Sequence, residues 1–178
     1  VFIAIQSLNS IFINFINGLS TKETAKINYL FNVLKPDFYT KNQLQKLHKV
    51  LSLINPTKTT LGFTIYNEQF EYQYLIDLAK KYNINRIRWS IAAPNMDGGE
   101  YKIINQFPKI ADRISEFLKD VKKENIETSQ DCGYMPLCFF DEKDLFNLNF
   151  NLKNVSMRSG CIGSPVDIDN KGNAWRCY

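Results

Sequence analysis

Four cysteines gather in the last third of the chain, and they carry its clearest chemistry. Five residues separate Cys132 from Cys138, and fifteen separate Cys161 from Cys177. The second pair brackets two short apolar strands joined by a turn-prone Asn-Lys-Gly run at 170–172, so a β-hairpin there would bring both thiols to one place. Thiolates are soft ligands, and four that converge suit zinc or an iron–sulfur cluster.

Three interpretations of these thiols are open. Free cysteine is among the most buried residue types, and the apolar neighbours of Cys138 fit an ordinary core thiol. Two disulfides would need an oxidising compartment, which nothing in the sequence marks. Metal binding is the interpretation that the paired arrangement favours. Structural zinc usually shows Cys-x2–4-Cys knuckles, which neither pair has, whereas iron–sulfur clusters accept irregular spacings, so the spacing leans toward iron and sulfur.

Strand-like and helix-like segments alternate along the rest of the chain and must position the cysteines. The strands are predicted at 10–16, 59–66, 86–93 and 126–130, and the helices at 22–34, 41–54, 75–82 and 110–121. This alternation predicts an α/β fold of βαβ units with parallel strands, either part of a β/α barrel or an open sheet. In both architectures functional residues lie at the carboxyl ends of the strands, and Cys132 follows the last predicted strand.

Composition excludes several classes of function. The chain has 178 residues, 44% of them hydrophobic, which is enough for one core, and its net charge of +4 is spread too evenly to indicate nucleic acid as a partner. No apolar stretch approaches the ~20 residues that span a bilayer, and the first residues do not form a signal peptide. His48 falls opposite a leucine stripe, so we expect a solvated surface histidine. The chain begins at Val1 and stops just after Cys177, so we expect it to be a piece of a longer protein.

The second cysteine pair resembles a known motif. Cys161, ten residues, Gly172, four residues and Cys177 match the Cys-x9–15-Gly-x4-Cys element that opens the SPASM and twitch auxiliary-cluster extensions of radical SAM enzymes. The resemblance implies that residues 1–130 are the second half of that family's partial β/α barrel. Residues 131–178 would be the auxiliary-cluster region with its cysteine-bracketed β-hairpin. It also implies that an auxiliary [4Fe–4S] cluster is ligated by Cys132, Cys138, Cys161 and Cys177.

The resemblance further places S-adenosylmethionine and substrate at the strand ends. Asn14 and Asn17, after the first predicted strand, would contact the ribose or amino-acid part. Thr64 lies in a segment that takes the place of the family's Gly-x-Ile-x-Gly-x-x-Glu element, although it matches that element poorly. Ser90 and Asn95, at the next strand and its loop, would contact adenine and carboxylate. The ordinary alternative for all five is a capping or loop role.

The chain departs from the family in one respect. Radical SAM chemistry needs a Cys-x3-Cys-x2-Cys loop, and no cysteine precedes residue 132, so this chain alone cannot cleave S-adenosylmethionine. We expect the loop upstream, in an intact oxidoreductase that generates a 5′-deoxyadenosyl radical and modifies a small molecule or a peptide. Such an enzyme would work in a reducing cytoplasm with an electron donor such as flavodoxin or ferredoxin. The alternative hypothesis is a non-catalytic β/α binding module with a structural four-cysteine zinc site.

Overall fold

A computed structural model describes residues 2–5, 14, 16–24, 26–92, 105–130, 140–143, 155–156, 166–168 and 174–176. Its strands are β1 (Phe2–Ile5), β2 (Asn28–Asn32), β3 (Thr59–Ile65), β4 (Arg86–Ile91), β5 (Glu127–Gln130), β6 (Val155–Ser156), β7 (Val166–Ile168) and β8 (Ala174–Arg176). Its helices are α2 (Thr21–Thr24), α3 (Lys41–Leu53), α4 (Gln73–Lys81) and α5 (Phe107–Lys123), with single 3₁₀ turns at Pro36–Phe38 and Pro56–Lys58. Among these residues no helix is long and apolar enough to cross a membrane.

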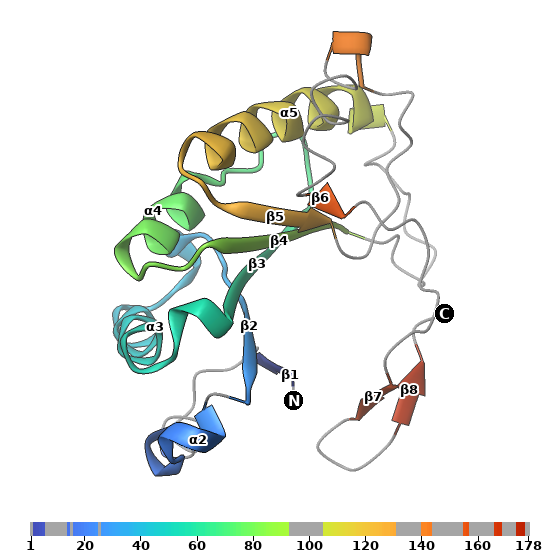
Figure 1. The fold of residues 1–178 in the computed structure, drawn as a ribbon. Coiled ribbons are helices and arrows are strands. Elements are labelled where there is room, and N and C mark those ends of the chain that lie inside the picture. The colour runs from blue at the N-terminus through green and yellow to red at the C-terminus, as the bar shows by residue number, and fades with distance from the viewer. Residues whose placement is uncertain are drawn as a thin grey trace.

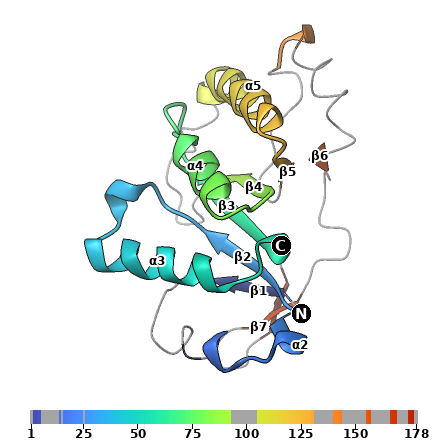
Figure 2. The ribbon, with the colours of Figure 1, turned by 60° about the vertical axis from the view of Figure 1, so that its left-hand side comes forward.

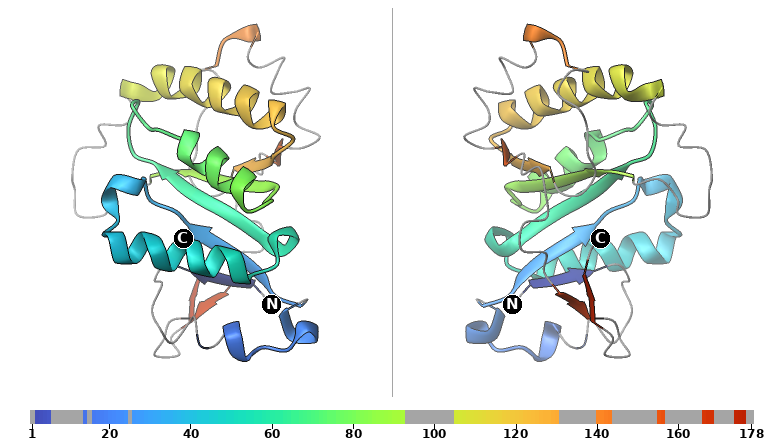
Figure 3. Two further views of the ribbon diagram at one scale, coloured as in Figure 1. Left: turned by 90° about the vertical axis from the view of Figure 1, so that its left-hand side faces the viewer. Right: turned by 90° about the vertical axis from the view of Figure 1, so that its right-hand side faces the viewer.

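Strands β1 to β6 form one sheet in which every neighbouring pair is parallel and the spatial order follows the chain (Figure 1). Parallel neighbours need a crossover connection, and α3, α4 and α5 lie in three successive ones, from β2 to β5. All three helices cover the same side of the sheet (Figures 1 and 3). Figure 2 shows them stacked in chain order, α3 below α4 and α4 below α5. The predicted α/β class with parallel strands is therefore confirmed.

Strands β7 and β8 stand apart from this sheet. They pair antiparallel, with Val166 opposite Arg176 and Ile168 opposite Ala174. The pair lies on the side of the sheet away from α3, α4 and α5 (Figure 1).

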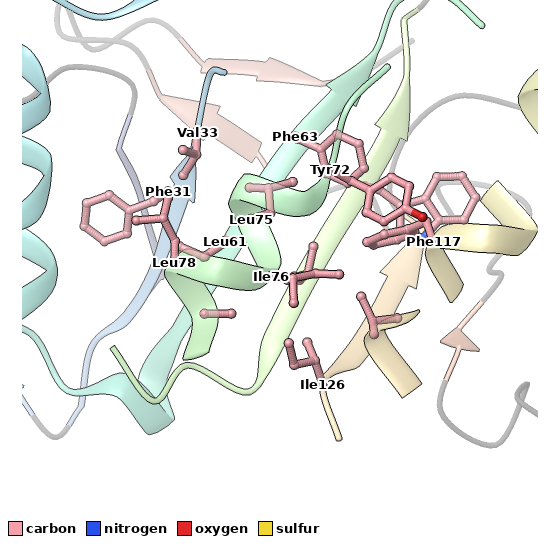
Figure 4. Packing of buried hydrophobic residues seen from close by; sticks show 14 of the residues in the cluster. Phe31, Val33, Leu61, Phe63, Tyr72, Leu75, Ile76, Leu78, Phe117 and Ile126 are labelled. Carbon is pink, nitrogen blue, oxygen red and sulfur yellow. The ribbon is translucent and has the colours of Figure 1, made fainter. Parts of the chain in front are cut away.

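The core fills the space between the sheet and the helices. In β3 and β4 alternate residues are buried, because successive side chains of a strand point to opposite faces. Aromatic side chains join the layers: Phe63 of β3 and Tyr72, beside α4, both contact Phe117 of α5, with ring centroids 5.5 and 5.2 Å apart (Figure 4). The largest fully buried side chains are Trp89, Tyr29, Phe31, Phe117, Leu47, Leu61, Ile65, Leu75, Ile76, Ile87, Ile110 and Ile114.

The helix boundaries follow from local capping chemistry. α3 begins with a capping box in which the Thr40 hydroxyl accepts from the Gln43 amide while the Gln43 side chain accepts from the Thr40 amide. α4 and α5 each end at an asparagine with positive φ, Asn83 at 55° and Asn125 at 56°. After each, the amide of an isoleucine bonds back over the last turn, from Ile84 to the Ala79 carbonyl and from Ile126 to Val121. These are Schellman motifs, and each leads the chain from its helix into the next strand.

Two predicted elements are wrong. The predicted helix at 22–34 is a helix only at Thr21–Thr24, because Asn28–Asn32 is strand β2. The run from Ile27 to Leu34 is nearly all apolar, so it fits a helical stripe as well as a strand, and a place inside a parallel sheet selects the strand. The predicted strand at 10–16 is also wrong in its described part, because Asn14 and residues 16–18 have helical backbone.

Candidate functional site on the polar face of the sheet

The face of β2–β5 that turns away from α3, α4 and α5 carries a group of polar side chains. Its members are Asn32, Thr64, Arg88, Ser90 and Ser129, and we call this group the polar face. On β4 the alternation of the strand buries the odd-numbered residues against the helices and leaves the even-numbered ones half-buried on the other side.

Two predicted site residues meet on this face. Thr64 and Ser90 are register partners on β3 and β4, and their hydroxyl oxygens lie 3.1 Å apart in a hydrogen bond. Both are half-buried and sit near the carboxyl ends of their strands, where ligands bind in β/α folds. The prediction that these two residues share one site at the strand ends therefore agrees with their geometry.

A second row of residues crosses the sheet one step nearer the strand starts. Asn32 pairs in register with Gly62, Gly62 with Arg88, and Arg88 with Ser129. At its centre Gly62 has no side chain, and a Cβ built there would stand 2.6 Å from Asn32 Oδ1. The Asn32 side chain therefore leans over the glycine. A glycine inside a strand often marks such a close approach.

Charge on the polar face is divided between its two ends. Arg86, at the start of β4, is paired with Glu127 of β5, with Nε 3.3 Å from the carboxylate oxygen. Arg88 is half-buried and faces the small Ser129 in register. The positive end of this face thus lies beside Thr64 and Ser90, and its described acid lies at the opposite end.

Other predicted site residues do not join this group. Asn14 and Asn17 are exposed and precede α2. Within the described part of the chain neither forms a hydrogen bond to Thr64 or Ser90. Asn95 lies outside the described residues, as do Cys132, Cys138, Cys161 and Cys177. Among the residues that the structure does describe, no cluster of three or more His, Cys, Asp or Glu side chains could hold a metal ion.

Sequence reasoning missed Asn32 and left Arg88 undecided. Asn32 was hidden because its segment was assigned to a helix, although the alternation of Tyr29, Phe31 and Val33 was the signal that could have exposed it. Arg88 and Trp89 flank Ser90, and the sequence alone does not say which of them shares its face. The structure buries Trp89 in the core at 1% exposure, so Arg88 is the residue beside Ser90.

A separate cleft of about 570 Å³ opens on the helix side, between the turn at Pro36–Phe38, the start of α4 and Arg113 of α5. Its charges are already matched. The Lys35 ammonium lies 2.7 Å from Glu71 and 3.1 Å from Asp37, and Arg113 bonds Glu116 at 2.7 Å. We therefore regard this cleft as a junction between elements.

Tyr72 shows how tightly that junction is tied. Its hydroxyl donates to Asp120 at 2.9 Å, and Arg113 lies 5.1 Å from its ring centroid. Burial, together with the Asp120 carboxylate, raises the pKa of Tyr72 to about 12. The phenol therefore stays protonated near neutral pH and acts as a hydrogen-bond donor.

His48 is not the solvated histidine that the helix pattern predicts. It is half-buried on α3, and its Nδ1 lies 2.7 Å from the Tyr82 hydroxyl at the end of α4. Burial, and then the charge of Lys81, lower the pKa of His48 below its usual range. The pair fastens two neighbouring helices together.

No protein-family model, curated protein or solved structure matches this chain. The site is accordingly argued from its own residues.

Proposed function

We propose that the chain is the carboxyl-terminal part of a radical SAM oxidoreductase. It would comprise the second half of a partial β/α barrel and an auxiliary-cluster region. The observation that carries this proposal is the winding of the sheet. Parallel strands in sequence order with their helices on one side are the arrangement of a β/α barrel, whereas doubly wound sheets reverse their order and have helices on both sides.

The polar face supports the same proposal. In a barrel the face without helices is the interior, and the carboxyl ends of its strands form the mouth where substrates bind. Thr64 and Ser90 place two hydroxyl groups there, which suits the ribose and amino-acid parts of S-adenosylmethionine. When bound to a reduced cluster in the parent enzyme, that cofactor supplies a 5′-deoxyadenosyl radical, which requires a Cys-x3-Cys-x2-Cys loop from elsewhere in the protein. The role of this chain's residues is to bind and orient.

The auxiliary cluster would be held by Cys132, Cys138, Cys161 and Cys177. The antiparallel pairing of β7 with β8 supports a hairpin between the last two, because both strands lie within the interval that these cysteines bracket. Iron–sulfur clusters take four thiolates, and this is the number that the chain offers. The cluster would serve electron transfer or substrate binding, with a small molecule or a peptide as the substrate and flavodoxin or ferredoxin as the electron donor.

The test is anaerobic reconstitution of the full chain with iron and sulfide, followed by metal analysis and Mössbauer spectroscopy. We expect about four irons per chain in a [4Fe–4S] signature. The double variant Cys161→Ala/Cys177→Ala should lose the cluster. The matched control Ser159→Ala/Ser164→Ala changes the same segment and should retain it.

Two outcomes would reject the proposal. Tight zinc without iron would favour the binding module with a structural zinc site. Unchanged iron in the double cysteine variant would show that the hairpin thiols are not ligands. Circular dichroism of each variant separates loss of the cluster from loss of the α/β core.

A further inference from the structure

The middle of the polar face has a gap flanked by hydrogen-bond donors. Neighbouring strands lie about 4.8 Å apart, so the Cα atoms of Asn32 and Arg88 stand roughly 10 Å apart with Gly62 between them. Because the glycine has no side chain, the two longer side chains can approach the same space from either side. The Asn32 side chain already reaches over it.

The groups around this gap are mainly donors. A guanidinium carries five N–H donors in a planar fork, and its geometry matches the two oxygens of a carboxylate or a phosphate. The Asn32 amide and the hydroxyls of Thr64 and Ser90 add donors one strand away or one step along. The described acid of this face, Glu127, is paired with Arg86 at the other end of β4. A half-buried cation between neutral polar groups favours an anionic ligand.

We propose that the polar face binds an oxyanion, the carboxylate or phosphate group of a small ligand, with Arg88 as its main contact. Asn32 binds the same group across Gly62, and the Thr64–Ser90 pair lies beside it toward the strand ends. The inference rests on β2–β5 alone, so it stands whether or not the cysteines bind a cluster. It goes beyond the proposed function, because it assigns the chemical class of the bound group and the residue that selects it.

The experiment uses the full chain and titrates inorganic phosphate and, separately, acetate, with chloride holding the ionic strength constant. Backbone amide shifts of Gly62, Thr64 and Ser90 in NMR spectra report binding at the polar face. We expect saturable shifts centred on these three amides, and the tighter of the two anions identifies the source as phosphate or carboxylate.

Variants of the two arginines on the same strand and face give the decisive comparison. Loss of a charge-assisted, bidentate contact should make Arg88→Gln bind the preferred anion at least tenfold more weakly. Its matched control, Arg86→Gln, removes an equal charge two residues away and should change the affinity less than twofold. Equal weakening in both variants would mean an adventitious ion only and would overturn the proposal, as would shifts spread over the whole surface.

A third variant keeps the test open if Arg88→Gln does not fold. Asn32→Asp leaves the arginine in place and puts a carboxylate across Gly62 from it. We expect this change to abolish anion binding while the far-UV circular dichroism stays that of the unchanged protein. Undiminished anion binding by Asn32→Asp would refute the assignment. Iron content after reconstitution is a separate readout, so failure of the cluster proposal and failure of this one are distinguishable.

Discussion

Gly62→Ala tests whether the close packing on the polar face is as described. The new Cβ would stand 2.6 Å from Asn32 Oδ1 and 3.2 Å from Leu30 Cδ1. Moving Asn32 out of its rotamer costs about 0.5–1.5 kcal/mol. Overpacking the buried Leu30 costs about 1–3 kcal/mol more. A smaller unfolded-state entropy offsets about 0.4–1 kcal/mol of this. We therefore expect the free energy of unfolding to fall by about 1–3 kcal/mol.

The assay is urea unfolding followed by circular dichroism for Gly62→Ala, Asn32→Ala and the double variant. If Asn32 lies over the glycine, the double variant should recover about 0.5–1.5 kcal/mol relative to the sum of the single changes. The control is Gly18→Ala, where a Cβ meets nothing within 4 Å and should not destabilise the protein. Additivity within about 0.5 kcal/mol would refute the contact between Asn32 and Gly62.

Three further predictions concern the helix layer. His48 has a lowered pKa, so the folded state binds fewer protons than the unfolded state as pH falls below about 6.5, and stability should decline there; Tyr82→Phe should weaken the neutral form, and NMR titration of this single histidine checks both. Thr40→Ala removes the capping box and should cost about 1 kcal/mol in urea unfolding, a result contradicted by an unchanged midpoint. Phe117→Ala should cost about 3–5 kcal/mol, whereas Phe38→Ala, at a side chain 73% exposed, should change stability by less than about 0.5 kcal/mol.

The sequence predicted most of the layered fold correctly, because several segments combine a clear period with a boundary signal. Thr40 before a leucine stripe announces α3, and the apolar positions between Ile110 and Val121 fall on one face of α5. The segment 59–66 is apolar and β-branched and becomes β3, which ends at Ile65. In these regions local propensity and tertiary packing favour the same structure.

The failures come from segments where period and packing conflict. Between Ile27 and Leu34 the apolar residues are too dense to reveal a period, and only pairing with β1 and β3 decides for a strand. That error also concealed Asn32. Thr64 and Ser90 could be assigned to one site because each ends a recognisable strand, whereas the register that aligns Arg88 with Gly62 is a property of the assembled sheet. The cysteine ligands, the cluster and the hairpin thiols stay predictions.

The order of the sheet has a consequence for how the chain folds. Each strand from β2 to β6 pairs with the strand that precedes it in the chain, so no sheet contact spans more than one connection. Such a topology keeps the mean sequence separation of contacts low for a parallel sheet, which favours rapid folding. A chain synthesised from its amino end can add each strand to an edge that already exists. The segments with the cysteines emerge last, onto a template that is already built.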